Sequence, residues 1–74
     1  MARKERQGTL VYDNATGRMD VRFGVEEYYG GLHCGDCFDV MIAGYWMPTR
    51  IEMAEDWYLV GVKTRDLVGL RVRF

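Results

Sequence analysis

Long hydrophobic runs are missing from this chain, so the sequence predicts no membrane-spanning helix. The longest apolar stretches, such as Val40-Met41-Ile42-Ala43, have the length of a strand, and a membrane helix needs roughly 20 apolar residues. The charged segment at residues 1–7 is followed by no apolar segment of the kind found in secretory signals. We therefore expect a cytoplasmic protein that does not enter the membrane.

An excess of charge of either sign is missing too. The 74 residues carry 10 Lys+Arg and 11 Asp+Glu, which gives a formal net charge of -1. This balance argues against a strongly basic tail that binds nucleic acid and against an acidic disordered segment. The length allows one domain at most, and a hydrophobic fraction of 49% is typical of a globular chain.

A two-residue alternation of apolar and polar side chains is present instead, interrupted by turn residues. The clearest case is residues 18–23, where Met19, Val21 and Phe23 share one face. A period of two is the signature of a half-buried strand. Pro48 cannot donate to a strand ladder, so we expect it at an edge or a bulge. Further strands are predicted at residues 8–13, 37–42, 45–53, 57–62 and 70–74.

These runs predict an all-β fold, a small SH3-like barrel of five to six antiparallel strands. A long loop follows the first hairpin, and one short 3₁₀ turn is expected over residues 64–67. Residues 8–74 are predicted to form the single domain, and residues 1–7 a flexible polar arm. No stretch keeps the helical period over ten or more residues.

The loop from Val25 to Asp36 is rich in glycine, acids and tyrosine, and it is long enough for so small a domain to suggest a role. Aromatic rings beside such a loop can bind an extended Pro-rich peptide, and nearby acids can contact its basic residues. We therefore expect a binding or accessory module whose partner is another protein. The candidate ligand-binding residues are Tyr28, Tyr29, Leu32, Trp46, Glu26 and Glu27. The structural alternative is that a tyrosine caps the barrel and that Trp46 belongs to the core.

A cationic set supports a second hypothesis, that of an accessory protein that binds nucleic acid. Alternation puts Arg71 and Arg73 on one exposed face of the last strand, and small barrels can bind nucleic acid through such faces. The full set is Arg50, Lys63, Arg65, Arg71 and Arg73. The net charge of -1 argues against strong affinity for phosphates, and a solvated face paired with acids explains the same pattern.

The segment His33-Cys34-Gly35-Asp36-Cys37 supports a third hypothesis, a zinc knuckle, because Cys-x-x-Cys is a metal-binding spacing. The chain supplies two cysteines and one histidine, whereas a structural zinc site needs four ligands. We expect no cofactor, and we expect Cys34 and Cys37 to be reduced thiols that pack beside a turn. His33 and Cys34 point to opposite sides of an extended chain, so we expect no catalytic pair and no enzyme activity.

The central loop and the strands after it resemble an uncharacterised family of short bacterial proteins, associated with Gram-positive bacteria and their mobile elements. The matching stretches are YYGGLHCGD at residues 28–36, RFG at 22–24, WMPTRIE at 46–52, WYLVG at 57–61 and GLRV at 69–72. The resemblance implies a compact β fold. It implies no activity, so no catalytic residue is carried over, and Cys37 stands where an aliphatic residue is usual.

Overall fold

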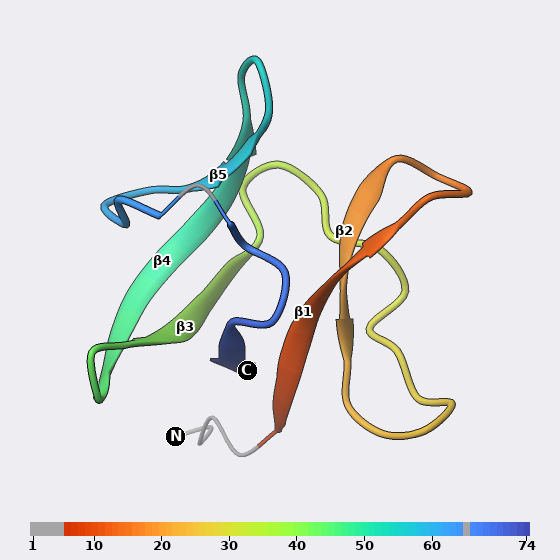
Figure 1. The fold of residues 1–74 in the computed structure, drawn as a ribbon, viewed down its shortest axis with the longest axis horizontal. Coiled ribbons are helices and arrows are strands. Elements are labelled where there is room, and N and C mark those ends of the chain that lie inside the picture. Colours follow the sequence, from red (N-terminus) through yellow and green to blue (C-terminus); the bar gives the residue numbers. More distant parts are fainter. Residues whose placement is uncertain (1–5, 65) are drawn as a thin grey trace.

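A computed structural model describes residues 6–64 and 66–74 of the chain. Its strands pair antiparallel in one sheet of order β2-β1-β6-β3-β4-β5 (Figure 1). The prediction of an all-β protein with six antiparallel strands is confirmed. No helix that could cross a membrane occurs in the described ranges. The strands are β1 (Gln7–Asp13), β2 (Arg18–Arg22), β3 (Cys37–Ile42), β4 (Tyr45–Met53), β5 (Trp57–Leu59) and β6 (Arg71–Arg73).

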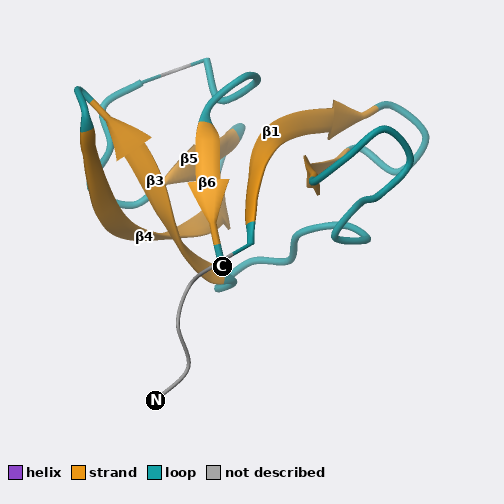
Figure 2. Ribbon diagram, turned by 90° about the horizontal axis from the view of Figure 1, so that it is seen from below, coloured by secondary structure: helices purple, strands orange, loops and turns teal. Residues whose placement is uncertain are grey.

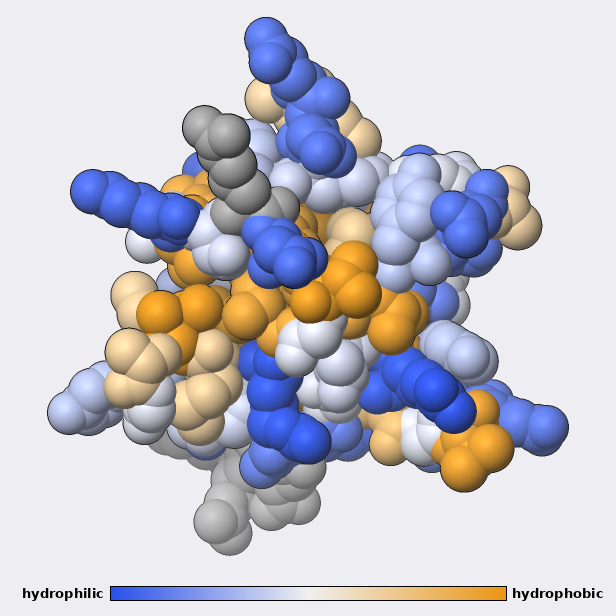
Figure 3. Space-filling view, in the orientation of Figure 1, coloured by the Kyte–Doolittle hydropathy of each residue, from blue (hydrophilic) through white to orange (hydrophobic). Residues whose placement is uncertain are grey.

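The sheet curves around a common interior without closing into the predicted barrel (Figure 2). β2 and β5 are its two edges, and no pairing joins them among the described residues. The connector between β5 and β6 packs against the core at Leu67, which is buried. Figure 3 shows apolar side chains in a band across the middle of one face, with charged side chains around it.

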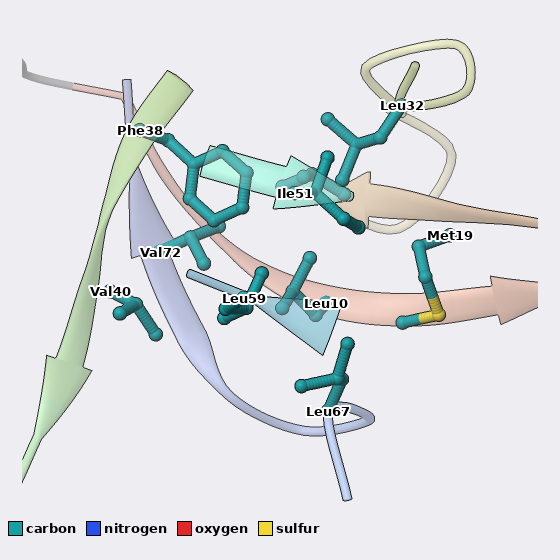
Figure 4. Packing of buried hydrophobic residues seen from close by; sticks show 10 residues of the cluster. Leu10, Met19, Leu32, Phe38, Val40, Ile51, Leu59, Leu67 and Val72 are labelled. Atoms are coloured by element: carbon teal, nitrogen blue, oxygen red, sulfur yellow. The ribbon is translucent and has the colours of Figure 1, made fainter. Parts of the chain in front are cut away.

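The core consists of aliphatic side chains with one phenylalanine and one methionine, drawn from the strands, the long loop and the connector (Figure 4). Met19 and Val21 of β2 and Phe38 and Val40 of β3 point inward and are buried, as the two-residue period predicts. Asp20 and Asp39, which lie between them on the opposite face, are buried as well. The buried apolar residues are Leu10, Met19, Val21, Leu32, Phe38, Val40, Ile51, Leu59, Leu67 and Val72.

Pro48 lies where β4 has a neighbour on one side only, which confirms the expected edge position. β5 pairs with the stretch from Ile51 to Met53, so the first half of β4 has only β3 beside it. The Val60 N–H donates to the Arg50 carbonyl (3.0 Å), so the backbone N–H and carbonyl of Arg50 point away from β3. Backbone groups two residues apart in a strand point to the same side, so the Pro48 nitrogen also faces away from β3. Because proline has no N–H, this side of β4 lacks a donor there and pairs less readily with another chain.

The ladder between β1 and β6 includes residues that the sequence assigned to the polar arm. Gln7 already belongs to β1 and pairs with Arg73 of β6. One residue earlier, the backbones of Arg6 and Phe74 exchange hydrogen bonds of 3.3 and 2.8 Å. The boundary of the arm was therefore wrong at residues 6 and 7, because the C-terminal strand extends the ladder toward the N-terminus. Residues 1–5 lie outside the described part.

The predicted 3₁₀ turn over residues 64–67 includes Arg65, which lies outside the described residues. The turn that the structure describes in this connector comes later. There the Leu70 N–H donates to the Leu67 carbonyl at 3.2 Å, and Gly69 sits inside the turn with a φ of 95°. The chain therefore reverses immediately before β6.

Candidate functional site

The long loop that follows the first hairpin returns along the outer edge of β2 and does not stand away from the sheet (Figure 1). The Tyr29 N–H donates to the Val21 carbonyl and the Leu32 N–H to the Met19 carbonyl, each at 2.8 Å. Tyr28 also forms an isolated antiparallel bridge with Arg22. Residues 28–32 therefore cover an edge strand that would otherwise expose unpaired backbone groups.

The carboxylate of Asp20 fixes the loop in this position. One of its oxygens, Oδ1, accepts hydrogen bonds from the backbone N–H groups of Val21 (2.7 Å), Gly30 (3.0 Å) and Gly31 (3.0 Å). Both glycines have positive φ, 109° and 99°, a conformation that side chains disfavour. Asp20 is only 8% exposed, although the alternation of β2 placed it on the solvent face.

Removing this carboxylate is expected to weaken the fold and to release the loop. Asp20→Ala leaves three backbone donors without their acceptor, and we expect a loss of about 2 kcal/mol in the free energy of unfolding. Asp20→Asn keeps a neutral acceptor and should lose roughly half as much. Urea unfolding measures both values, and amide exchange at Gly30 and Gly31 should accelerate in the alanine variant. Unchanged exchange there would contradict this role for Asp20.

Leu32 was predicted as a ligand-binding residue, and the structure corrects this prediction. Its side chain is fully buried and belongs to the hydrophobic core, where it lies beside Ile51 and Met19 in Figure 4. The hydrogen bond from its backbone to β2 fixes the loop at the position from which the side chain points inward. Leu32 therefore stabilises the fold and offers no surface to a partner.

The two tyrosines of the loop lie in different surroundings. The Tyr29 ring stacks on Phe74 with ring centroids 4.9 Å apart, and Phe74 in turn packs against Phe38 at 5.1 Å. Tyr29 thus packs on an aromatic cluster at the end of the sheet, and 43% of its surface remains exposed. Tyr28 is half exposed and lines a groove of about 580 Å³ together with Arg22 and Val11 on the outer side of the β1–β2 hairpin.

The other residues predicted to bind beside the loop are Glu26, Glu27 and Trp46. Glu26 is exposed, and Glu27 forms an ion pair with Arg6. Trp46 lies on β4, which β1, β6 and β3 separate from β2 in the sheet. The guanidinium of Arg73 stacks over the Trp46 ring, 4.5 Å from its centroid. Trp46 therefore lies apart from the loop residues of the predicted site.

The predicted cationic surface is partly neutralised. Arg73 donates to Asp39 at 2.9 Å, and Arg50 donates to Glu52 at 3.0 Å. Lys63 and Arg71 are exposed, and Arg65 lies outside the described residues. Since each paired arginine would have to give up a carboxylate before contacting a phosphate, these contacts lend no support to a nucleic-acid interface.

The His33-to-Cys37 segment forms a turn. The His33 N–H donates to the Asp36 carboxylate at 2.9 Å, and the Asp36 N–H donates to the His33 carbonyl at 3.0 Å. Cys34 and Cys37 are free thiols, and both are exposed rather than packed as expected. Across residues 6–64 and 66–74, no group of three or more His, Cys, Asp or Glu could hold a metal ion. The zinc hypothesis therefore gains no support from the geometry.

A groove that the sequence analysis missed lies between the β1–β2 hairpin and the connector to β6. Its volume is about 370 Å³. The indole N–H of Trp57 donates to the Gly17 carbonyl at 2.9 Å, which holds β5 against the hairpin turn and fixes the ring at the groove. We call it the Tyr12–Trp57 groove. It is lined by Tyr12, Met19, Asp56, Trp57, Asp66, Leu67 and Val68.

A second hollow adjoins this groove, because Asp56 and Trp57 line both. It adds Glu55 and the half-exposed ring of Tyr58. Three acids therefore line the two hollows, and no cation does so among the described lining residues. The sequence did carry a signal, since Glu55-Asp56-Trp57-Tyr58 places two acids before two aromatic residues. Only a strand over residues 57–62 was predicted here from the sequence, and Trp57 also packs against the hydrophobic core.

The fold and these hollows define a small all-β protein with one curved sheet and shallow grooves at the ends of its hairpins. The chain belongs to the DUF5348 family, described as a domain of unknown function, which matches residues 8–74. The resemblance to an uncharacterised family is thereby confirmed.

A solved structure shows the same fold. The chain is similar to a protein from Ruminococcus gnavus, a structural genomics target known from its crystal structure. The two sequences are 61% identical, the TM-score is 0.89, and the match covers 93% of this chain and 100% of that one. No curated protein matches the chain. The family assigns no function, so the function has to be argued from the surface.

Proposed function

We propose that this protein is a binding module that recognises another protein through the Tyr12–Trp57 groove. Met19 and Leu67 are buried and form an apolar floor, whereas Tyr12 and Val68 are about half exposed beside it. An apolar centre with a polar rim is the usual anatomy of a protein interface, and aromatic side chains are enriched in such surfaces. This combination of aromatic walls, apolar floor and acidic rim is the observation that carries the proposal.

The proposed partner is a protein, as expected from the sequence, but the proposed site is the Tyr12–Trp57 groove and not the long loop. Recognition of a protein segment by aromatic rings and acids was expected at the long loop. Leu32 is buried, Tyr29 stacks on Phe74, and Glu27 is paired with Arg6, so the loop lacks a joint surface. The groove brings the same residue types together from β1, β5 and the connector.

A photo-crosslinking amino acid at Val68 tests this proposal in cells. Val68 is 55% exposed in the groove, and Val25, which is 81% exposed in the long loop, provides a control position. We expect a discrete protein adduct from position 68, whose partner mass spectrometry identifies, and none from position 25. An adduct from position 25 alone would assign recognition to the loop, and no adduct from position 68 would overturn the proposal.

A pair of tyrosine variants separates groove binding from chance contact. Tyr12→Ala removes one wall of the groove, whereas Tyr45→Ala removes an exposed ring that lines none of the three hollows. Truncation of an aromatic residue at the centre of an interface typically costs about 2 kcal/mol or more in binding, a change of roughly thirtyfold. The adduct from position 68 should therefore disappear in Tyr12→Ala and persist in Tyr45→Ala. Equal yields in the two variants contradict the proposal.

A further inference from the structure

We infer that the Tyr12–Trp57 groove takes an arginine side chain from an extended segment of its partner, placed against the Trp57 ring and between Asp56 and Asp66. The inference rests on the proposed function and specifies the chemistry of the partner. It depends on three features of the groove, namely the fixed indole, the acids that have no ion-pair partner within residues 6–64 and 66–74, and the adjoining hollow.

The Trp57 ring is held in place before any partner arrives. Its indole N–H is bound to the Gly17 carbonyl at 2.9 Å, and its backbone N–H donates to Oδ1 of Asp56 at 2.8 Å. Trp57 therefore makes both hydrogen bonds, and these hold its ring and the Asp56 carboxylate in place relative to each other. A preorganised wall lowers the entropy lost when a ligand side chain packs on it.

The charges of the groove favour a cation. Neither Asp56 nor Asp66 forms an ion pair with any residue in the described ranges. A neutral or acidic occupant would remove water from these carboxylates without compensation, and such desolvation is unfavourable. A cationic side chain compensates both of them.

Arginine matches this geometry better than lysine does. The guanidinium is planar, so it can lie flat on an indole ring while its edge donates to a carboxylate. The molecule already contains such an arrangement, since Arg73 stacks over Trp46 and donates to Asp39. Lysine supplies a single strongly hydrated charge and forms no bidentate bond with a carboxylate.

The adjoining hollow favours a segment of chain over a free amino acid. It begins at the same Asp56 and Trp57 and continues past Tyr58 to Thr64. Residues on either side of the arginine can therefore contact a surface as well. An extended segment is also the shape that shallow grooves lined by aromatic rings accept.

Titration of the full-length protein with short synthetic peptides, followed by NMR, tests the inference. The peptides share an alternating proline and alanine frame, and a central residue that is arginine, citrulline, lysine or glutamate. Citrulline has nearly the shape of arginine without its charge. In one spectrum, the indole N–H signal of Trp57 reports binding at the groove, and that of Trp46 reports binding elsewhere, on β4. We expect the arginine peptide to shift the Trp57 signal and to bind roughly tenfold more tightly than the citrulline peptide.

Charge-removing variants complete the test. The double variant Asp56→Asn with Asp66→Asn should lose roughly tenfold in affinity for the arginine peptide, because both compensating charges are removed. Glu26→Gln is the matched control, since Glu26 is exposed and lines none of the hollows. Equal binding of the arginine and citrulline peptides overturns the inference, and so does a shift confined to the Trp46 signal.

The two proposals fail in different ways. If position 68 yields a protein adduct in cells but none of the peptides depends on arginine, the groove binds a protein by other chemistry and only the inference fails. If position 68 yields no adduct, the proposed function fails, whatever the peptides do.

Discussion

Leu32→Ala is expected to lower the free energy of unfolding by about 3–4 kcal/mol, an unusually large loss for a residue outside every strand. Leu32 is fully buried, and its N–H donates to the Met19 carbonyl, so the backbone cannot easily move to fill the cavity. The cost of such a truncation combines the lost apolar burial with the cavity that remains. The effect should therefore resemble that of a truncation in the centre of the sheet.

Val25→Ala is the matched control, because Val25 belongs to the same loop and is 81% exposed. Surface substitutions of this kind usually change stability by less than about 0.5 kcal/mol. Urea unfolding of both variants, with the denaturant slope compared to that of the wild type, gives the two values. If the losses are similar, or if that of Leu32→Ala stays below about 1 kcal/mol, the loop is not a component of the core.

The strands could be predicted from the sequence because their signal is local. In β2 and β3 apolar side chains recur at every second position and are buried or pack against the core, and a strand that buries one face imposes that period directly. The strand boundaries were less predictable where they depend on a distant partner. Gln7 joins β1 because Arg73 lies opposite, and nothing near Gln7 in the sequence indicates this.

The course of the loop could not be predicted, because long-range contacts decide it. Asp20 looks like an outward residue of a strand, and Gly30-Gly31 looks like a flexible linker. Only the folded chain brings the carboxylate to the two glycine N–H groups, at 3.0 Å each. The residues of the loop taken alone are typical of a flexible segment. The burial of Leu32 and the hydrogen bonds to the edge of β2 favour a loop that is bound to the sheet.

The candidate site was missed for a related reason. Tyr12, Trp57 and Asp66 come from β1, β5 and the connector, three segments that meet only through the folding of the sheet. From the sequence, aromatic and acidic residues were expected to act together in recognition, and they were placed in the loop from Val25 to Asp36. In the folded chain, the aromatic and acidic residues of the groove come from several elements and not from one loop.

Gly8→Ala is the second substitution with a large expected effect, about 3 kcal/mol, although it adds one methyl group. A Cβ at Gly8 would lie 2.6 Å from Cγ1 of Val21, 2.7 Å from the carbonyl oxygen of Arg22 and 2.9 Å from the Phe23 ring. The carbonyl belongs to the backbone of β2 and cannot rotate away. Overpacking of this kind typically costs about 1–3 kcal/mol, and more where the backbone has to move.

Gly24→Ala distinguishes this clash from the general effect of replacing glycine. A Cβ at Gly24 meets nothing closer than the Cβ of Glu27 at 3.7 Å, which is an ordinary contact. Replacing a glycine without strain reduces the entropy of the unfolded chain, so this variant should match the wild type or gain about 0.5 kcal/mol. For a domain of this size, a difference of 3 kcal/mol between the two variants corresponds to roughly 12–24 °C in Tm. Equal melting temperatures would show that β1 and β2 can separate at Gly8 without cost. The close approach of the two strands would then not fix the hairpin on which Asp20 and the loop depend.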